Sequence, residues 1–226
     1  MGGFFNEVAI MNYPTSVGTV SVSTQMTGKM QGVEAISTSP LLNPFCQASC
    51  KLKGAICKHC FAQRAIKMYK GLKASLERNF AILTVHLLNK NDAMCIRFNS
   101  VIGRIEAFGD VANVKHARNY IRIVRANKNV RFAVWTKNPG IWDKAIEIEG
   151  KPRNLSMVLS SRYENTIAKD YEKFSWVDYV FTVYTKEYLE EHSEITINCG
   201  AKKCMACQQC YRRHKDGVRF INELRK

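Results

Sequence analysis

The chain has 226 residues, 46% of them hydrophobic, and a formal net charge of +15 at pH 7. This length supports a sizeable hydrophobic core, so the chain does not need disulfide bonds to compensate for small size. It contains no run of about eighteen apolar residues, which excludes a membrane-spanning helix. The charge predicts a polyanionic partner such as nucleic acid, although a basic protein without such a partner would have the same composition.

The first residues, MGGFFNEVAIM, contain neither a basic start nor a long apolar stretch, and so do not resemble a secretory signal. Asn6 also stands where a myristoylation signal requires Ser or Thr. We therefore expect a cytoplasmic protein without a membrane partner, in a compartment that keeps thiols reduced. The nine cysteines are then predicted to bind metal rather than to form disulfides.

Short segments rich in β-branched and aromatic residues alternate with segments of helical periodicity. The predicted strands are residues 33–39, 94–100, 130–137, 155–161, 179–184 and 195–200. The predicted helices are residues 61–87, 113–127, 139–148, 163–174 and 186–192. This alternation predicts parallel βαβ units. A closed eight-unit barrel needs a longer chain, so we expect an α/β fold that forms a partial, open (βα)6 barrel.

The simplest division is one domain with an extension. Residues 1–200 are expected to form the partial barrel, with a cysteine loop at 46–60, and residues 199–226 a Cys-rich, basic C-terminal extension. The charge of the last sixteen residues, YRRHKDGVRFINELRK, favours contact with nucleic acid. The alternative is an amphipathic terminal helix that packs Val218, Ile221 and Leu224 inward.

Ligands of parallel α/β folds bind at the carboxyl ends of the strands, and the predicted strand ends are polar here. We therefore expect a substrate or cofactor pocket at these ends. The candidate pocket residues are Arg97, Asn99, Lys137 and Ser160. The alternative is that these positions are polar only because they meet solvent.

Eight of the nine cysteines fall into two tight groups. The first cysteine group consists of Cys46, Cys50, Cys57 and Cys60. The second cysteine group consists of Cys199, Cys204, Cys207 and Cys210. They follow the first and the sixth predicted strand, so a sheet that curves back toward its start would bring both to one rim. Cys95 lies inside a predicted strand and is interpreted as a buried apolar residue.

The spacing of the second group indicates an iron–sulfur cluster. Three cysteines separated by two residues each, at 204, 207 and 210, wrap thiolates around one cluster face, and Cys199 completes the set. Zinc is the alternative, because it also binds four thiolates. The first group could hold zinc, with His59 nearby, or give a cluster three ligands and leave one iron open. Cys50 is then either a fourth ligand or a spare thiol. One or two [4Fe–4S] clusters are therefore expected.

A cysteine loop after the first strand of a six-unit partial barrel resembles the radical S-adenosylmethionine superfamily. The resemblance implies that Cys46, Cys57 and Cys60 hold a [4Fe–4S] cluster whose open iron binds S-adenosylmethionine for reductive cleavage to a radical. It also implies an auxiliary cluster in the C-terminal extension. The usual spacing is Cys-x3-Cys-x2-Cys, whereas six residues separate Cys50 from Cys57 here.

The same superfamily has a Gly-Glu element after its second strand that binds the amine of the cofactor. Its counterparts here are Gly103 with Glu106, and Gly109 with Asp110, so the resemblance adds Glu106 to the candidate pocket. The sequence also resembles uncharacterised Cys-rich proteins of phages and plasmids, which implies a mobile-element context. Two functions remain open: a radical or redox enzyme, and a non-catalytic iron–sulfur or zinc protein that binds nucleic acid through its basic surface.

Overall fold

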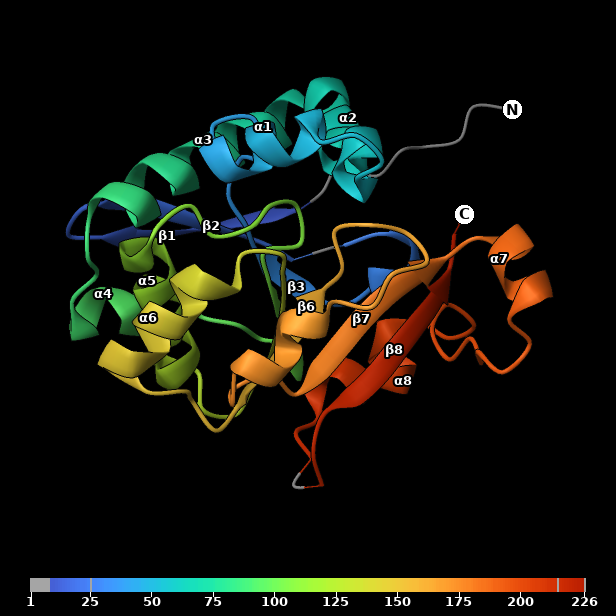
Figure 1. Ribbon diagram of the computed structural model, residues 1–226. Helices are drawn as coiled ribbons and strands as arrows, with labels where there is room; N and C mark the ends of the chain where they lie inside the picture. Colours follow the sequence, from blue (N-terminus) through green and yellow to red (C-terminus); the bar gives the residue numbers. More distant parts are fainter. Residues whose placement is uncertain (1–8, 25, 215, 226) are drawn as a thin grey trace.

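The fold is an open, mostly parallel sheet of eight strands with helices packed against it (Figure 1). The computed structural model describes residues 9–24, 26–214 and 216–225. The strands lie in sequential order, and the terminal strands β1 and β8 each pair with a single neighbour, so the sheet does not close. Residues 1–8, which include most of the stretch considered as a signal, lie outside the described residues.

The first two strands are antiparallel and the rest are parallel. β1 (Ile10–Thr15) and β2 (Gly18–Ser23) form a hairpin, and β2 pairs antiparallel with β3 (Glu34–Ile36). The strands parallel to β3 are β4 (Ile102–Ile105), β5 (Arg131–Thr136), β6 (Leu155–Ser160), β7 (Tyr179–Tyr184) and β8 (Arg219–Leu224). Each parallel neighbour follows the previous one in the chain, which is the arrangement that repeated strand–crossover–strand units produce.

The connections between the strands carry the helices. The α-helices are α1 (Pro44–Lys51), α2 (Phe61–Met68), α3 (Lys70–Val85), α4 (Lys90–Cys95), α5 (Val114–Ala126), α6 (Pro139–Glu149), α7 (Lys186–Glu191) and α8 (Cys204–Cys207). The 3-10 turns are η1 (Gly28–Met30), η2 (Ile56–His59), η3 (Lys169–Lys173) and η4 (Gln209–Tyr211). Within the described residues, none of the helices combines the length and the apolar character that crossing a membrane requires.

Both faces of the parallel strands are covered. Helices α3, α5 and α6 pack on one face, where Tyr120, Phe132 and Trp142 are fully buried in the main core. On the other face, Tyr211 and its neighbours pack against Ile102 and other strand residues. A sheet covered on both faces explains why its strands read as almost continuous apolar runs.

The sequence predicted the α/β class and most of the elements correctly. The confirmed strands are 33–39, 130–137, 155–161 and 179–184, which contain β3, β5, β6 and β7. The confirmed helices are 113–127, 139–148 and 186–192, which correspond to α5, α6 and α7. The β1–β2 hairpin was not predicted.

The predicted strand at 94–100 is wrong, because a capped helix occupies its start. The Asn89 side chain accepts a hydrogen bond from Asp92 N at 2.9 Å, and the Asp92 carboxylate accepts one from Asn89 N, which fixes the first turn of α4. The helix runs to Cys95, and the strand begins only at Ile102. Cys95 is therefore exposed, and its interpretation as a buried residue is wrong.

The predicted strand at 195–200 is also wrong. Within the described residues, this segment forms an isolated bridge between Cys199 and Glu223 and further hydrogen bonds to β8, such as Asn198 N to the Asn222 carbonyl at 3.2 Å, but no regular strand. The sixth parallel strand is β8, which pairs along the whole of β7, so the alternative of a terminal helix at the C-terminus is wrong. Ile221 is buried on the sheet as a strand residue.

Two predicted helices are interrupted or much shorter. The segment 61–87 divides at Tyr69, whose extended backbone (φ −115°, ψ 99°) separates α2 from α3. The segment 163–174 contains only the 3-10 turn η3.

Gly103 in β4 allows a close contact inside the core. A Cβ at this position would lie 2.5 Å from Phe132 Cε1 and 3.2 Å from Phe98 Cδ1. We expect Gly103→Ala to lower the free energy of unfolding by about 1–3 kcal/mol in urea titrations. Gly71→Ala is the control, since nothing lies within 4 Å of its Cβ and alanine favours the helix. Equal stability of the two variants would contradict this account of the core.

Candidate metal centres

The first cysteine group lies in the connection that follows β3, at the carboxyl edge of the sheet (Figure 1). Cys46 and Cys50 are four residues apart on α1, so they share one face of that helix. Cys57 lies in η2, and Cys60 immediately precedes α2. Two helices and the turn between them therefore present all four side chains in one region.

Two anchors hold this connection over the strand ends. The buried Asn43 caps α1 by accepting a hydrogen bond from Phe45 N at 3.0 Å, and its amide donates to the Asp110 carbonyl at 2.6 Å. On the other side, Ile56 N donates to the Arg162 carbonyl at 2.9 Å, just after β6. The segment that carries the thiols thus spans from the end of β4 to the end of β6.

The four thiols lie close enough to influence one another's ionisation. Burial raises the pKa of Cys46 far above its ordinary value, and the charges of Asp110, Glu106, Cys57 and Cys60 raise it further. Burial also raises the pKa of Cys50, with contributions from Cys60 and Cys57. Binding a metal cation would relieve this crowding, because it displaces the thiol protons.

A buried carboxylate, Glu106, lies at the end of β4 beneath the first group. Its Oε1 accepts hydrogen bonds from Thr38 Oγ1 at 2.8 Å and from the Tyr120 hydroxyl at 2.5 Å, and His116 Nε2 lies 3.3 Å away. Its backbone is left-handed, with φ +51°. A Cβ at Gly109 would lie only 2.8 Å from Glu106 Oε2, so this carboxylate requires glycine there.

A second buried carboxylate, Asp110, joins the same region to β5. It accepts hydrogen bonds from Val111 N at 2.8 Å, Thr136 Oγ1 at 2.8 Å and Lys137 N at 2.7 Å. Burial raises the pKa of Asp110 to about 6, against the effect of these donors. Lys137 follows β5 directly and lowers the pKa of Cys57, which burial raises. The buried Ser160 ends β6 at the same edge.

The expected position of Arg97 and Asn99 at this edge is wrong. Both residues precede β4, so they lie at the amino edge of the sheet. Asn99 N donates to Glu34 Oε2 at 2.6 Å, and Glu34 is the first residue of β3. The displacement follows from the wrong strand at 94–100. Of the candidate pocket residues, the structure brings Glu106, Lys137 and Ser160 to the carboxyl edge.

The second cysteine group lies across the other face of the sheet. Cys199 forms a bridge to β8, Cys204 and Cys207 begin and end α8, and Cys210 lies in η4. The left-handed Gln208 (φ 52°) turns the chain between α8 and η4. Because the segment returns over the sheet before β8 begins, the expectation that both groups share one rim is wrong.

The cation of Arg104 faces the second group. The Arg104 guanidinium lies 3.2 Å from the ring centroid of Trp135, and its enclosed Nε has no hydrogen-bond partner among the described residues. Burial lowers the pKa of Arg104 to about 10, while Tyr211, Cys210 and Cys204 act in the opposite direction. A guanidinium with a buried, unpaired nitrogen is costly unless a negative charge lies beside it.

A second cation contacts Cys199 directly. Lys29 Nζ donates to Cys199 Sγ at 2.9 Å and to Glu223 Oε1 at 2.8 Å. Burial lowers the pKa of Lys29, but these two hydrogen bonds outweigh burial and raise it overall. The sequence analysis did not identify Lys29 or Arg104. A charged residue in the otherwise apolar strand IGRI was a signal for Arg104, whereas nothing in the sequence pointed to Lys29.

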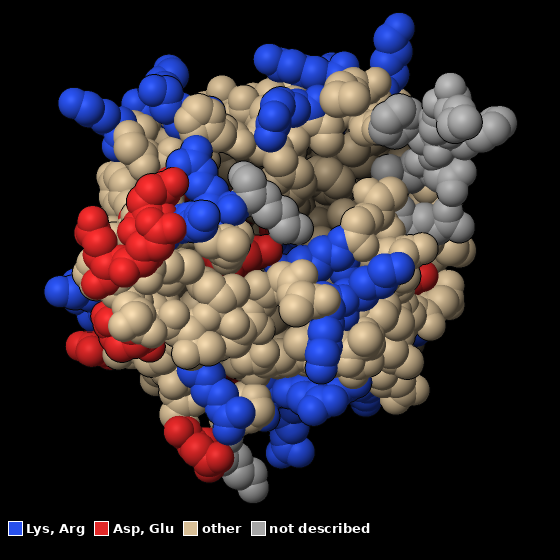
Figure 2. Space-filling view, turned by 90° about the vertical axis from the view of Figure 1, so that its right-hand side faces the viewer, with Lys and Arg blue, Asp and Glu red and all other residues tan. Residues whose placement is uncertain are grey.

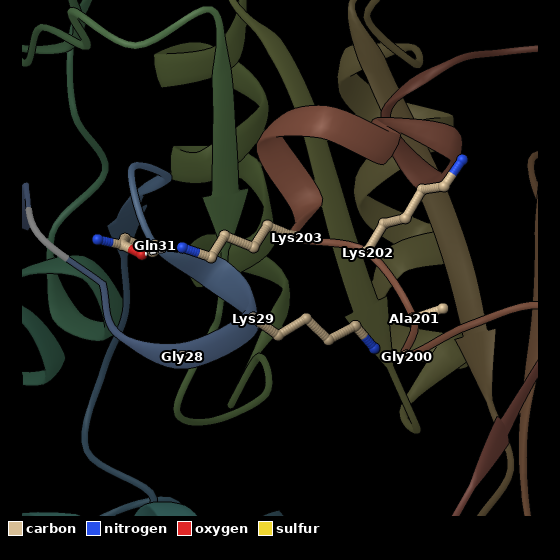
Figure 3. Close-up of a pocket in the computed structure, with 7 residues that line it drawn as sticks. All are labelled: Gly28, Lys29, Gln31, Gly200, Ala201, Lys202 and Lys203. Carbon is tan, nitrogen blue, oxygen red and sulfur yellow. Dashed lines mark hydrogen bonds between the residues drawn. The ribbon is translucent and has the colours of Figure 1, made fainter.

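A pocket of about 410 Å³ lies beside Cys199, between η1 and the loop at 200–203. Figure 3 shows Lys29 pointing toward Gly200 and Ala201 from the opposite wall. Lys203 Nζ donates to Gln31 Oε1 at 2.5 Å across the pocket. The contact between Lys29 and Cys199 is therefore next to a space lined by basic side chains.

Each cysteine group gathers four thiols, the donor type that zinc and iron–sulfur clusters bind. All nine cysteines are free thiols, and the eight in the two groups are each partly buried. Over residues 9–24, 26–214 and 216–225, no three Cys, His, Asp or Glu side chains are arranged to hold a single metal ion. The two groups are thus gathered more loosely than the ligands of one ion.

Comparison with known proteins gives one family. Residues 21–224 match the model of the family described as Gene product 88, so the chain belongs to that family. No curated protein matches the chain. No solved structure matches it either. The family fits the resemblance to phage-borne proteins that the sequence suggested, and its description assigns no reaction.

The Lys29–Cys199 contact predicts a measurable change in thiol reactivity. Burial raises the pKa of Cys199, and the Lys29 hydrogen bond and charge lower it. In metal-free protein, Lys29→Met should raise this pKa and slow alkylation of Cys199 at pH 8 by about tenfold, because less thiolate is present. Peptide mass spectrometry after timed alkylation measures the rate. Lys202→Met, in the same pocket, should leave it unchanged, and equal effects of both variants would contradict the contact.

Proposed function

We propose that this chain is an iron–sulfur protein in which each cysteine group holds a [4Fe–4S] cluster. The observation that carries the proposal is the Arg104 guanidinium beside the second group, whose buried Nε has no hydrogen-bond partner among the described residues. A cluster with four thiolate ligands is anionic, and it would give this enclosed cation the counter-charge that neutral thiols cannot provide. Lys29 would donate a hydrogen bond to the thiolate of Cys199 in the same centre.

The run of Cys204, Cys207 and Cys210 at two-residue spacing favours a cluster over a single zinc ion. Zinc binds sulfur at about 2.3 Å, so its four thiolates must approach one another to about 3.8 Å. A four-iron cluster binds each thiolate to a different iron and accepts a wider set. In this proposal Cys199, Cys204, Cys207 and Cys210 hold the second cluster. Cys46, Cys57 and Cys60 hold the first cluster. Cys50 is not a ligand in this proposal, and its thiol accepts a hydrogen bond from Gln63 Nε2 at 3.2 Å.

The first centre is proposed as the reactive one, because it lies at the carboxyl edge where α/β sheets bind their ligands. Six parallel strands in sequential order support the likeness to radical S-adenosylmethionine enzymes. With three protein ligands, a cluster supplies one-electron chemistry and an open iron for that cofactor. The resemblance assigns the cofactor amine to Glu106, but this side chain is fully covered and its oxygens accept hydrogen bonds from Thr38 and Tyr120. Glu106 is therefore proposed to hold the strand ends beneath the first centre and not to contact the cofactor.

The metal content tests this proposal directly. Protein purified without oxygen should be brown and contain about eight irons and eight sulfides per chain. A variant with Cys204, Cys207 and Cys210 all changed to Ser should keep about four irons, because only the first cluster remains. Cys95→Ser is the matched control, since Cys95 is exposed and outside both groups, and it should keep the full content. A colourless protein with zinc and no iron would refute the proposal.

Radical chemistry has its own test. The reduced, iron-loaded protein should convert S-adenosylmethionine to 5′-deoxyadenosine and methionine, measured by chromatography, and Cys57→Ser should abolish this product. The triple Ser variant of the second group should still form it if the first centre alone is reactive. Absence of 5′-deoxyadenosine from a protein with full iron content would leave an iron–sulfur protein without radical activity.

A further inference from the structure

The segment that carries the first cysteine group is strongly basic. Residues 35–76 contain no Asp or Glu and seven Lys or Arg, which is nearly half of the net charge of +15. The seven are Lys51, Lys53, Lys58, Arg64, Lys67, Lys70 and Lys73, and all are exposed. We call residues 44–73, which comprise α1, η2, α2 and the first turn of α3, the basic cap.

The charge of the basic cap is not neutralised within the protein. Among the described residues, Lys73 is the one member of the seven that forms an ion pair, with Glu77 at 2.9 Å. Lys137 and Arg162 lie close enough to Cys57 to lower its pKa, so cations also approach the first group from the strand ends. The first cysteine group therefore lies near cations of the basic cap and near Lys137 and Arg162 at the strand ends.

An exposed aromatic ring lies within the basic cap. Phe61 directly follows Cys60, is 60% exposed, and has its ring centroid 6.1 Å from that of Phe108 at the end of β4. Phe61, Arg64 and Met68 are spaced by three and four residues, so they share the solvent face of α2. Surfaces that bind single-stranded nucleic acid combine exposed aromatic rings, on which bases stack, with cations that contact the phosphates.

The shape of the molecule suits a flexible ligand. Figure 2 shows Lys and Arg side chains at the top of the molecule, at the height of α1 and α2 in Figure 1, above a hollow in the surface. The cations near the first group come from two parts of the chain, the basic cap and the strand ends, where Lys137 and Arg162 act on Cys57. A flexible single strand can contact cations of both parts by bending, which a flat lipid surface cannot do.

We propose that the basic cap binds single-stranded nucleic acid, with phosphates on its Lys and Arg side chains and a base stacked on Phe61. The bound strand is then the substrate class of the first centre, a step that rests on the function proposed above. Binding itself does not depend on that function, because it needs only the charges and the ring.

The charge contribution is tested with the full-length, metal-loaded protein and fluorescent 20-nucleotide single strands of RNA and DNA. Fluorescence anisotropy should show binding that weakens steeply with salt. Arg64→Glu with Lys67→Glu should weaken binding at least tenfold and reduce the salt slope by about 1.4, which corresponds to two phosphate contacts. The control is Lys128→Glu with Arg153→Glu, which makes the same charge change in a basic pocket at the amino edge. It should change the affinity less than about twofold.

The stacking contribution is tested at Phe61. Phe61→Ala should weaken binding by about fivefold to a hundredfold without changing the salt slope, because it removes a base contact and no charge. Phe61→Trp should retain the affinity, since it keeps an aromatic face. Iron content of every variant is measured alongside and should equal that of the unaltered chain.

The outcomes separate the two proposals. Equal weakening by both charge-reversal pairs would mean that overall charge drives binding, and would overturn the site. Binding to anionic phosphatidylserine vesicles with no binding to either oligonucleotide would overturn it as well. A protein that lacks iron but binds strands through the cap would refute the iron–sulfur function alone. Full iron content with no strand binding would refute the inference alone.

Discussion

The hydrogen bonds between Glu106 and Thr38 join the ends of β4 and β3, the two strands that flank the basic cap. Glu106 Oε1 accepts from the Thr38 hydroxyl and Oε2 from its backbone N–H, in a fully covered position. The adjoining Ser37 carbonyl accepts from the Asn79 amide of α3. The buried carboxylate of Glu106 therefore fixes the two strand ends beneath the first cysteine group. Its position depends on the left-handed backbone of Glu106 and on the absence of a side chain at Gly109.

The two cysteine groups lie in different surroundings. The first gathers thiols, the buried carboxylates Glu106 and Asp110, and surface cations at the carboxyl edge of the sheet. The second lies against the sheet with Arg104 and Lys29, two cations that come from sequence segments far from the cysteines themselves. The same donor set thus occurs at the strand ends and against a face of the sheet, with all eight thiols partly buried.

Much of this arrangement was predictable, and the failures have identifiable causes. Apolar runs located the buried strands β5, β6 and β7, and cysteine spacing located both groups. Local capping overrode strand propensity around Cys95, and this misplaced Arg97 and Asn99. The short periodicity of β8 resembled a helix until its pairing with β7 decided it. The environment of Arg104 depends on tertiary packing, which no local pattern encodes.

The position of β8 links the completion of the sheet to the ordering of the second cysteine group. β8 is one of the two edge strands, and the long segment that carries the second cysteine group connects it to β7. Ordering that segment costs conformational entropy, which metal ligation would offset. In the iron–sulfur protein proposed above, ligation at the second cysteine group would therefore favour the pairing of β8 with β7, which covers an edge of β7 that would otherwise be exposed.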